Sequence, residues 1–269
     1  LPATYAHVAP DSSAFLNAGL FFLDQGFQKS ALAMLERSIQ TGPRNPIALL
    51  SAASLYARQE QPDKSSEILE NLIEFLPRYS AAHMAKAELF MRQNRPTDAI
   101  RSYAAVSQLN PQNADALMRL GTLQTHLKNY PEAEQAFLKV IALQPDFAIP
   151  YNELAFIWSE QPATLPKSIE FAHKAASLAP KNPAILDTLG WVYLKDNRPK
   201  EAAAHFQNAL RHAQSSDLAA TIHYHSALAC EKLGDMEGAF ASVRKALGAS
   251  TNFAEINDAK MFLSELAQR

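Results

Sequence analysis

The sequence predicts an all-α fold made of repeated pairs of short helices, and the spacing of its prolines is the first indication. One series recurs at intervals of 34 or 35 residues: Pro43, Pro77, Pro111, Pro145 and Pro180. A second series falls about midway between them: Pro62, Pro96, Pro131, Pro166 and Pro199. Proline suits the first turn of a helix and the loop that follows one, but not a helix interior. Each interval is therefore expected to contain two helices.

Small residues at two fixed positions of the repeat are the second indication. With Ser12 as position 1, position 8 holds Gly19, Ala53, Ala87, Gly121, Ala155, Gly190 and Ala227. Position 20 holds Ala31, Ser65, Ala99, Ala133, Ser168, Ala202 and Ala239. Positions 11 and 24 are mostly large and apolar, and such residues recur three or four positions apart, which is the period of an amphipathic helix. The two helices of each unit are expected to approach closely at the small residues.

This pattern resembles a known repeat family. The segment Leu186-x-x-Leu189-Gly190-x-x-Tyr193 with Ala202-x-x-x-Phe206 is similar to the consensus of the tetratricopeptide repeat. Seven units are expected, over residues 12–45, 46–79, 80–113, 114–147, 148–182, 183–216 and 220–253. The fifth has an extra residue in its inter-helix turn, and Asp217–Ala219 are expected to separate the last two. The resemblance implies a right-handed superhelical solenoid whose first helices line a concave face.

The two ends of the array differ in character. Residues 254–269 carry an apolar stripe at helical spacing, which predicts a capping helix. The first helix is apolar almost all round, which is typical of a buried helix. Two interpretations stay open: residues 1–11 form an N-terminal extension that covers it, or preceding repeats or a second copy meet it. The chain begins Leu1-Pro2 without a leader segment, which favours a processed or excised piece of a longer protein.

Charge and motifs argue against several classes of function. Lys and Arg total 25 against 27 Asp and Glu, so there is no basic excess of the kind that attracts nucleic acid. No phosphate-binding glycine loop and no H-E-x-x-H motif occurs, and the single cysteine, Cys230, takes a position that is mostly aromatic in the other repeats. No apolar run is long enough to span a membrane. We therefore expect no catalytic residues, no metal, no cofactor and no nucleic-acid partner.

The expected binding site is the concave face. By family resemblance, positions 2, 5, 6, 9, 12 and 13 of each repeat project there, and their mixture of methionine and aromatic residues is typical of peptide-binding surfaces. The alternative, that individual side chains pack against the neighbouring repeat, stays open. The predicted partner-binding residues are Met84, Glu88, Met91, Arg92, Met118, Arg119, Asn152, Glu153, Phe156, Asp187, Trp191 and Tyr224.

Position 13 forms a nearly basic row. It contains Arg58, Arg92, His126, Lys195 and Lys232, interrupted by Glu160. This row would steer an acidic partner, although cations near a helix C-terminus are also favoured by the helix dipole. The Lys and Asn pattern with which chaperone-binding members of the family hold a C-terminal carboxylate is missing.

A narrower resemblance concerns the C-terminal part. Ala184–Tyr193 and the segment from Ile222 to Glu255 are similar to bacterial tetratricopeptide lipoproteins linked to exopolysaccharide and PEP-CTERM sorting systems. This implies a periplasmic scaffold for protein or peptide partners in secretion or polysaccharide assembly. The alternative is a cytoplasmic adaptor or regulator that uses the same concave face in another complex.

Overall fold

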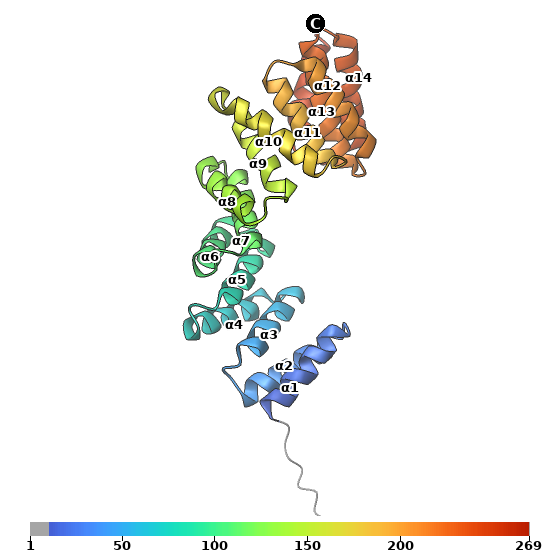
Figure 1. Ribbon diagram of the computed structural model, residues 1–269. Coiled ribbons are helices and arrows are strands. Elements are labelled where there is room, and N and C mark those ends of the chain that lie inside the picture. Colours follow the sequence, from blue (N-terminus) through green and yellow to red (C-terminus); the bar gives the residue numbers. More distant parts are fainter. Residues whose placement is uncertain (1–10, 269) are drawn as a thin grey trace, which may run out of the picture. The chain divides into compact units, whose positions relative to one another are not determined.

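The computed structural model describes residues 11–268, and within them the chain is a succession of helix pairs (Figure 1). The pairs are α1 (Ser12–Asp24) with α2 (Gln28–Thr41), α3 (Pro46–Arg58) with α4 (Pro62–Phe75), α5 (Ser80–Arg92) with α6 (Pro96–Leu109), α7 (Ala114–His126) with α8 (Tyr130–Leu143), α9 (Ala148–Ser159) with α10 (Leu165–Leu178), α11 (Pro183–Lys195) with α12 (Pro199–His212) and α13 (Ser216–Lys232) with α14 (Met236–Ala249). A last helix, α15 (Ile256–Leu266), follows them. The prediction of an all-α array of seven helix pairs is confirmed.

The described residues divide into two compact units, 11–123 and 124–268.

In six of the repeats, the turn between the two helices contains a residue whose backbone is in the left-handed conformation, with positive φ. It is always position 15: Gly26 (φ 79°), Glu60 (58°), Asn94 (55°), Lys128 (59°), Asn197 (56°) and Gly234 (78°). The fifth repeat has Pro162 at the corresponding place, and the proline ring fixes φ near −65°. The same turn therefore cannot form there, and a short 3-10 helix, Pro162–Thr164, connects α9 to α10.

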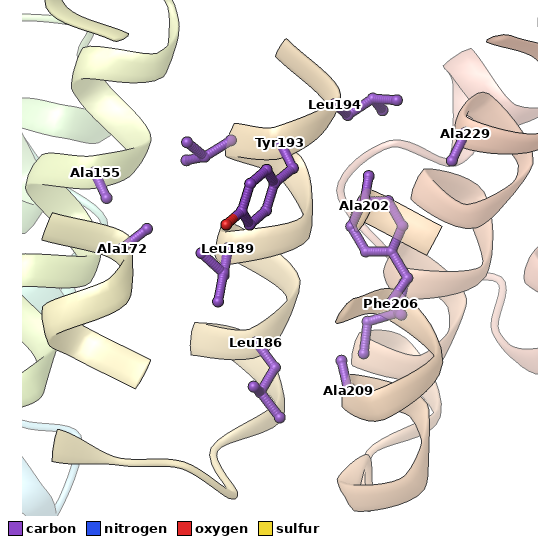
Figure 2. Packing of buried hydrophobic residues seen from close by; sticks show 12 residues of the cluster. Ala155, Ala172, Leu186, Leu189, Tyr193, Leu194, Ala202, Phe206, Ala209 and Ala229 are labelled. Atoms are coloured by element: carbon purple, nitrogen blue, oxygen red, sulfur yellow. The ribbon is translucent and has the colours of Figure 1, made fainter. Parts of the chain in front are cut away.

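Small residues allow the two helices of a repeat to pack closely, as the sequence predicts. A Cβ atom placed on Gly190 would lie 2.5 Å from Cε1 of Phe206, which is completely buried. In the first repeat, a Cβ atom on Gly19 would lie 2.8 Å from Cγ of Leu35. Figure 2 shows Phe206 on α12 within the buried cluster that also contains Leu189 of α11.

The three residues expected between the sixth and seventh repeats are helical. Residues 217–219 belong to the first turn of α13, which is 17 residues long. Leu218 packs against the core of the sixth repeat, and the Ser250 hydroxyl donates a hydrogen bond to the Asp217 carboxylate. These contacts hold the inserted residues as one additional helical turn.

The closing helix covers the core of the last repeat. Ala259 and Phe262 of α15 are buried in one cluster with Val243 and Ala246 of α14. The Phe262 ring also meets the ring of Tyr224 edge-on, with their centroids 6.3 Å apart. The face of α14 that would otherwise be exposed is therefore packed against α15.

The first helix leaves an apolar residue exposed at a position that every later repeat buries. Phe21 is at position 10 and is 61% exposed, whereas its six counterparts are at most 7% exposed: Leu55, Leu89, Leu123, Ile157, Val192 and Ala229. Leu55, for example, shares a buried cluster with Leu32 and Leu35 of the preceding repeat. The predicted cover, residues 1–11, lies outside the described residues apart from Asp11, which caps α1 by accepting a hydrogen bond from the Ala14 N–H at 2.8 Å.

We predict that the protein self-associates through the face of α1 that carries Phe21, because a large exposed apolar side chain at an interface position favours association. Phe21→Glu should lower the average mass measured by light scattering at high protein concentration. Met261→Glu is the matched control, because the side chain of Met261 on α15 is 60% exposed, about as much as that of Phe21. A native protein that stays monomeric at the highest concentration would contradict this prediction.

Candidate protein-interaction surface

In the first unit, the predicted binding residues lie on α5 and α7 with different exposure. Glu88, Met91 and Arg92 are exposed along α5, whereas Met84 is half-buried against the cluster that contains Tyr103. On α7, Met118 is half-buried, and the exposed Arg119 is held by Asp115, with Nε 2.9 Å from the carboxylate. The exposed part of this surface is therefore polar, with Met91 as its apolar side chain.

Two adjoining cavities open between α3, α4 and α5 and share the side chains of Arg58 and Arg92. The smaller cavity, about 80 Å³, is also lined by Ser54, Ser65 and Glu88. The larger, about 490 Å³, is also lined by Gln93. We call the two cavities together the α3–α5 pocket. The sequence analysis placed Arg58 and Arg92 in the basic row but did not predict a pocket beside them.

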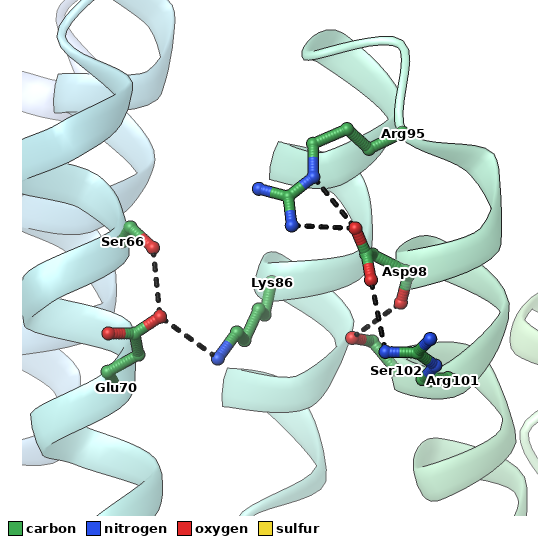
Figure 3. A network of polar contacts seen from close by, with 7 residues as sticks. All are labelled: Ser66, Glu70, Lys86, Arg95, Asp98, Arg101 and Ser102. Atoms are coloured by element: carbon green, nitrogen blue, oxygen red, sulfur yellow. Dashed lines mark hydrogen bonds and ion pairs between the residues drawn. The ribbon is translucent and has the colours of Figure 1, made fainter.

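Three other basic side chains in this unit, Lys86, Arg95 and Arg101, are paired with acidic ones (Figure 3). Lys86 of α5 lies 3.3 Å from Glu70 of α4 and so joins the second repeat to the third. The hydrogen bonds from Lys86 and Ser66 lower the pKa of the Glu70 carboxyl. Asp98 accepts hydrogen bonds from both Arg95 and Arg101.

In the second unit, three of the predicted binding residues are buried, which corrects their placement on an open surface. Asn152, Asp187 and Tyr224 all occupy position 5 of their repeats and are at most 9% exposed. For two of them the reason is that a later helix covers the side chain. Tyr224 contacts Phe262 of α15, and Asp187 contacts His225 of α13.

Asp187 and His225 form a buried pair between consecutive repeats. Nδ1 of His225 lies 2.9 Å and 3.0 Å from the two carboxylate oxygens of Asp187. Burial by itself would lower the pKa of His225, but the attraction of Asp187, the hydrogen bond to it and the charge of Glu255 together raise that pKa. The sequence analysis missed this pair, which joins position 5 of one repeat to position 6 of the next.

Trp191 is held in place from three sides. Its indole N–H donates to Glu160 at 3.4 Å, and its ring lies 4.7 Å from the ring of His225. Nζ of Lys195 lies 4.7 Å from the centroid of the Trp191 ring and 3.1 Å from the Glu160 carboxylate. Trp191 is half-buried, so these contacts fix its orientation while part of the ring stays accessible.

Two further predicted residues lie on α9, next to buried Asn152. Phe156 is 37% exposed, which is more than Trp191. Glu153 is half-buried, and burial raises the pKa of its carboxyl group against the opposing effects of Asn152 and His126. In this unit, the accessible part of the predicted surface is therefore Phe156 with the fixed Trp191, Glu160 and Lys195.

The thiol of Cys230 lies in an environment that makes it unreactive. Cys230 packs beside the core of the last repeat, and burial raises the pKa of its thiol, which disfavours the reactive thiolate. Among residues 11–268, no group of three or more His, Cys, Asp or Glu side chains is arranged to hold a metal ion. No helix in the same range combines the length and apolar character that crossing a bilayer requires.

Comparison with known proteins relates this chain to one repeat family. Two family models described as tetratricopeptide repeat match it, one over residues 84–146 and 188–253, the other over residues 23–89. A TPR repeat-containing protein of Pseudomonas aeruginosa is 26% identical over 110 residues, which are 41% of this chain and 19% of that protein. The match thus spans about a fifth of the length of this curated relative.

Solved structures show the same fold. The crystal structure of a tetratricopeptide repeat protein from Parabacteroides merdae is similar with a TM-score of 0.65 and 18% identity, covering 96% of this chain and 99% of that one. YrrB, described as a TPR protein with an unusual peptide-binding site, is similar with a TM-score of 0.60 and 12% identity. The match covers 69% of this chain and 95% of the YrrB chain. Proteins of this fold generally mediate protein–protein interactions. Because the family models together cover well over half of its length, the chain belongs to the tetratricopeptide repeat family.

Proposed function

We propose that this chain is a non-catalytic scaffold that binds a segment of a partner protein on the surface of its first helices. The observation that carries the proposal is the arrangement around Trp191. Glu160, Lys195 and His225 fix an aromatic ring that stays partly accessible, and Phe156 is exposed on the neighbouring first helix.

A fixed aromatic residue is well suited to bind a partner. Residues that dominate binding energy at interfaces are enriched in Trp, Tyr and Arg. Since the Trp191 side chain is already ordered by its neighbours, binding costs less conformational entropy than ordering a free side chain would. Charged side chains at the edge of the surface, such as Glu160 and Lys195, would favour one register of the partner over others.

The fold of YrrB is compatible with this proposal, because that protein is described as having a peptide-binding site. We further propose that the pathway is a bacterial envelope system for secretion or exopolysaccharide assembly, and that the protein works in the periplasm. The support is the likeness of Ala184–Tyr193 and of the segment up to Glu255 to envelope tetratricopeptide lipoproteins. Immunodetection in periplasmic and cytoplasmic fractions of the native host tests this location, and a purely cytoplasmic signal would contradict it.

Replacing Trp191 by alanine should weaken partner capture by about thirtyfold, because truncating a central aromatic anchor commonly costs about 2 kcal/mol or more. Partners are first identified by crosslinking and pull-down from the native host. Affinities are then compared for the native protein, Trp191→Ala and Phe156→Ala.

Phe240→Ala is the matched control, because Phe240 is as exposed as Phe156 but lies on a second helix, α14. Circular dichroism verifies that every variant stays folded. If folded Trp191→Ala and Phe156→Ala capture the partner as well as the native protein does, the first-helix surface of this unit is not the binding site.

A further inference from the structure

We propose that the α3–α5 pocket binds a carboxylate group of the partner segment, either an acidic side chain or the C-terminal carboxylate of the chain. This proposal rests on the proposed function and names the chemistry that the first unit recognises. Three observations carry it: two arginines without an acidic partner at one cavity, a buried hydroxyl without a hydrogen bond, and a volume that suits a small polar group.

The first observation is that Arg58 and Arg92 line the same cavities without an acidic partner. Within residues 11–268, no carboxylate lies within ion-pairing distance of either guanidinium, whereas Arg95, Arg101 and Arg119 in the same unit are all paired. The dipole of α3 and α5 favours a basic residue at each helix end, but it does not explain why both side chains line one cavity. A planar guanidinium donates two parallel hydrogen bonds to a carboxylate, so two such groups form a strong site.

The second observation is a buried hydroxyl that the pocket leaves without a partner. In the part of the chain that the structure describes, Oγ of Ser65 has no hydrogen bond. Ser65 is 1% exposed and lines the smaller cavity, and its hydroxyl can donate to a carboxylate. Buried polar atoms in folded proteins are nearly always hydrogen-bonded, and exceptions call for an explanation.

Ser168 shows that the missing hydrogen bond of Ser65 is a property of this pocket. It takes the same position in the fifth repeat, and its hydroxyl donates to the Ala155 carbonyl oxygen at 2.6 Å. Other repeats have alanine at this position, so the fold does not need a hydroxyl there. The Ser65 hydroxyl is therefore free to donate to a ligand that enters the cavity.

The third observation is the fit of volume and charge. The smaller cavity holds about 80 Å³, which is several times the roughly 10–15 Å³ that one water needs, so a group as small as a carboxylate has room to enter. Leu69 and Leu89 form its apolar walls. The charged side chains of this smaller cavity are Arg58, Arg92 and Glu88, so positive charges outnumber the negative one there, whereas Glu60 adds a second carboxylate at the larger cavity. Glu88 opposes an anionic ligand, and its neutralisation should strengthen binding.

The binding test uses three short synthetic peptides on the full chain labelled with ¹⁵N. Acetyl-Gly-Glu-Gly-amide carries a side-chain carboxylate, acetyl-Gly-Gln-Gly with a free C-terminus carries a chain-end carboxylate, and acetyl-Gly-Gln-Gly-amide carries none. We expect saturable shifts of the Arg58 and Arg92 side-chain signals with one or both acidic peptides, weakened by added salt. The acidic peptide that saturates identifies the source of the carboxylate. Equal shifts with the neutral peptide, or no saturable shift with either acidic one, would overturn the proposal.

Variants separate a ligand-binding role from a structural one. Arg58→Gln and Arg92→Gln should each weaken peptide binding about tenfold, and Glu88→Gln should tighten it severalfold. Ser65→Ala should weaken binding while its unfolding midpoint stays the same or rises, because it removes an unsatisfied buried hydroxyl. Ser168→Ala, the matched control, should lower the midpoint and leave binding unchanged. A Ser65→Ala protein that loses stability and keeps full binding would assign Ser65 a structural role and refute its part in the site.

The same variants are then tested for capture of the native partner. Combined Arg58→Gln and Arg92→Gln should reduce capture at least tenfold. If capture is undiminished in this double variant but lost in Trp191→Ala, the pocket is not a partner site, while the proposed scaffold function stands. If capture is undiminished both in the double variant and in Trp191→Ala, the carboxylate-pocket proposal and the scaffold proposal for these surfaces are both wrong.

Discussion

Replacing Phe262 by alanine is expected to lower the free energy of unfolding by about 3–5 kcal/mol, the usual cost of truncating a buried aromatic residue. Phe262 is the largest buried side chain of α15, and it packs in one cluster with Val243 and Tyr224. Its loss leaves a cavity between the closing helix and the last repeat. Chemical denaturation followed by circular dichroism measures the change.

Met261 is the matched control for this prediction. It is the preceding residue on the same helix, but its side chain is 60% exposed, so Met261→Ala should change the stability by no more than about 0.5 kcal/mol. Deletion of residues 254–269 should be at least as harmful as Phe262→Ala, because it also exposes Val243 and Ala246. A truncated protein with an unchanged denaturation midpoint would show that α15 is not needed as a cap.

Replacing Asp187 by asparagine is expected to destabilise the protein by about 3 kcal/mol near pH 5, because removal of one partner of a buried ion pair leaves the other charge uncompensated. The size of the effect should depend on pH through His225. In the native protein the pKa of His225 is raised, so the stabilisation by the charged pair is complete below the unfolded pKa of about 6.5. That stabilisation is lost as the pH rises through the higher folded pKa.

In Asp187→Asn the sign of this dependence should reverse. Without the carboxylate, burial dominates and lowers the pKa of His225, so protonation of the unfolded chain destabilises the fold below about pH 6.5. The stability difference between the two proteins should therefore be largest near pH 5 and shrink toward pH 9. His205 and His223, whose pKa values burial lowers, are present in both proteins, and their contributions cancel in the difference.

Denaturation of both proteins at several pH values measures this difference. Tryptophan fluorescence, to which Trp158 also contributes, is a second reading, since the Trp191 ring packs on His225. A stability difference that is constant from pH 5 to pH 9 would mean that the charge of His225 does not contribute to the pair.

The helices and their pairing were predictable because their determinants are local. Prolines at fixed intervals mark where helices begin or have ended, and Gly or Ala marks where two helices cross. The unusual turn of the fifth repeat also follows from one residue, since Pro162 cannot take the positive φ that the other repeats use. The extension of α13 was not predictable in this way. It depends on the packing of Leu218 and on the contact between Asp217 and Ser250, 33 residues apart.

The sequence by itself determined that this protein is an array of seven helix pairs with a closing helix, because each repeat encodes its own turn, crossing point and apolar face. Only the tertiary structure decided which residues of the first helices are accessible. Asp187 and Tyr224 occupy position 5 of their repeats, as Met84 does in the third. They are buried because His225 and Phe262 of later helices pack against them. The α3–α5 pocket likewise exists because Ser65, Arg58 and Arg92 come from three helices, and a periodic pattern does not show which side chains leave a space between them.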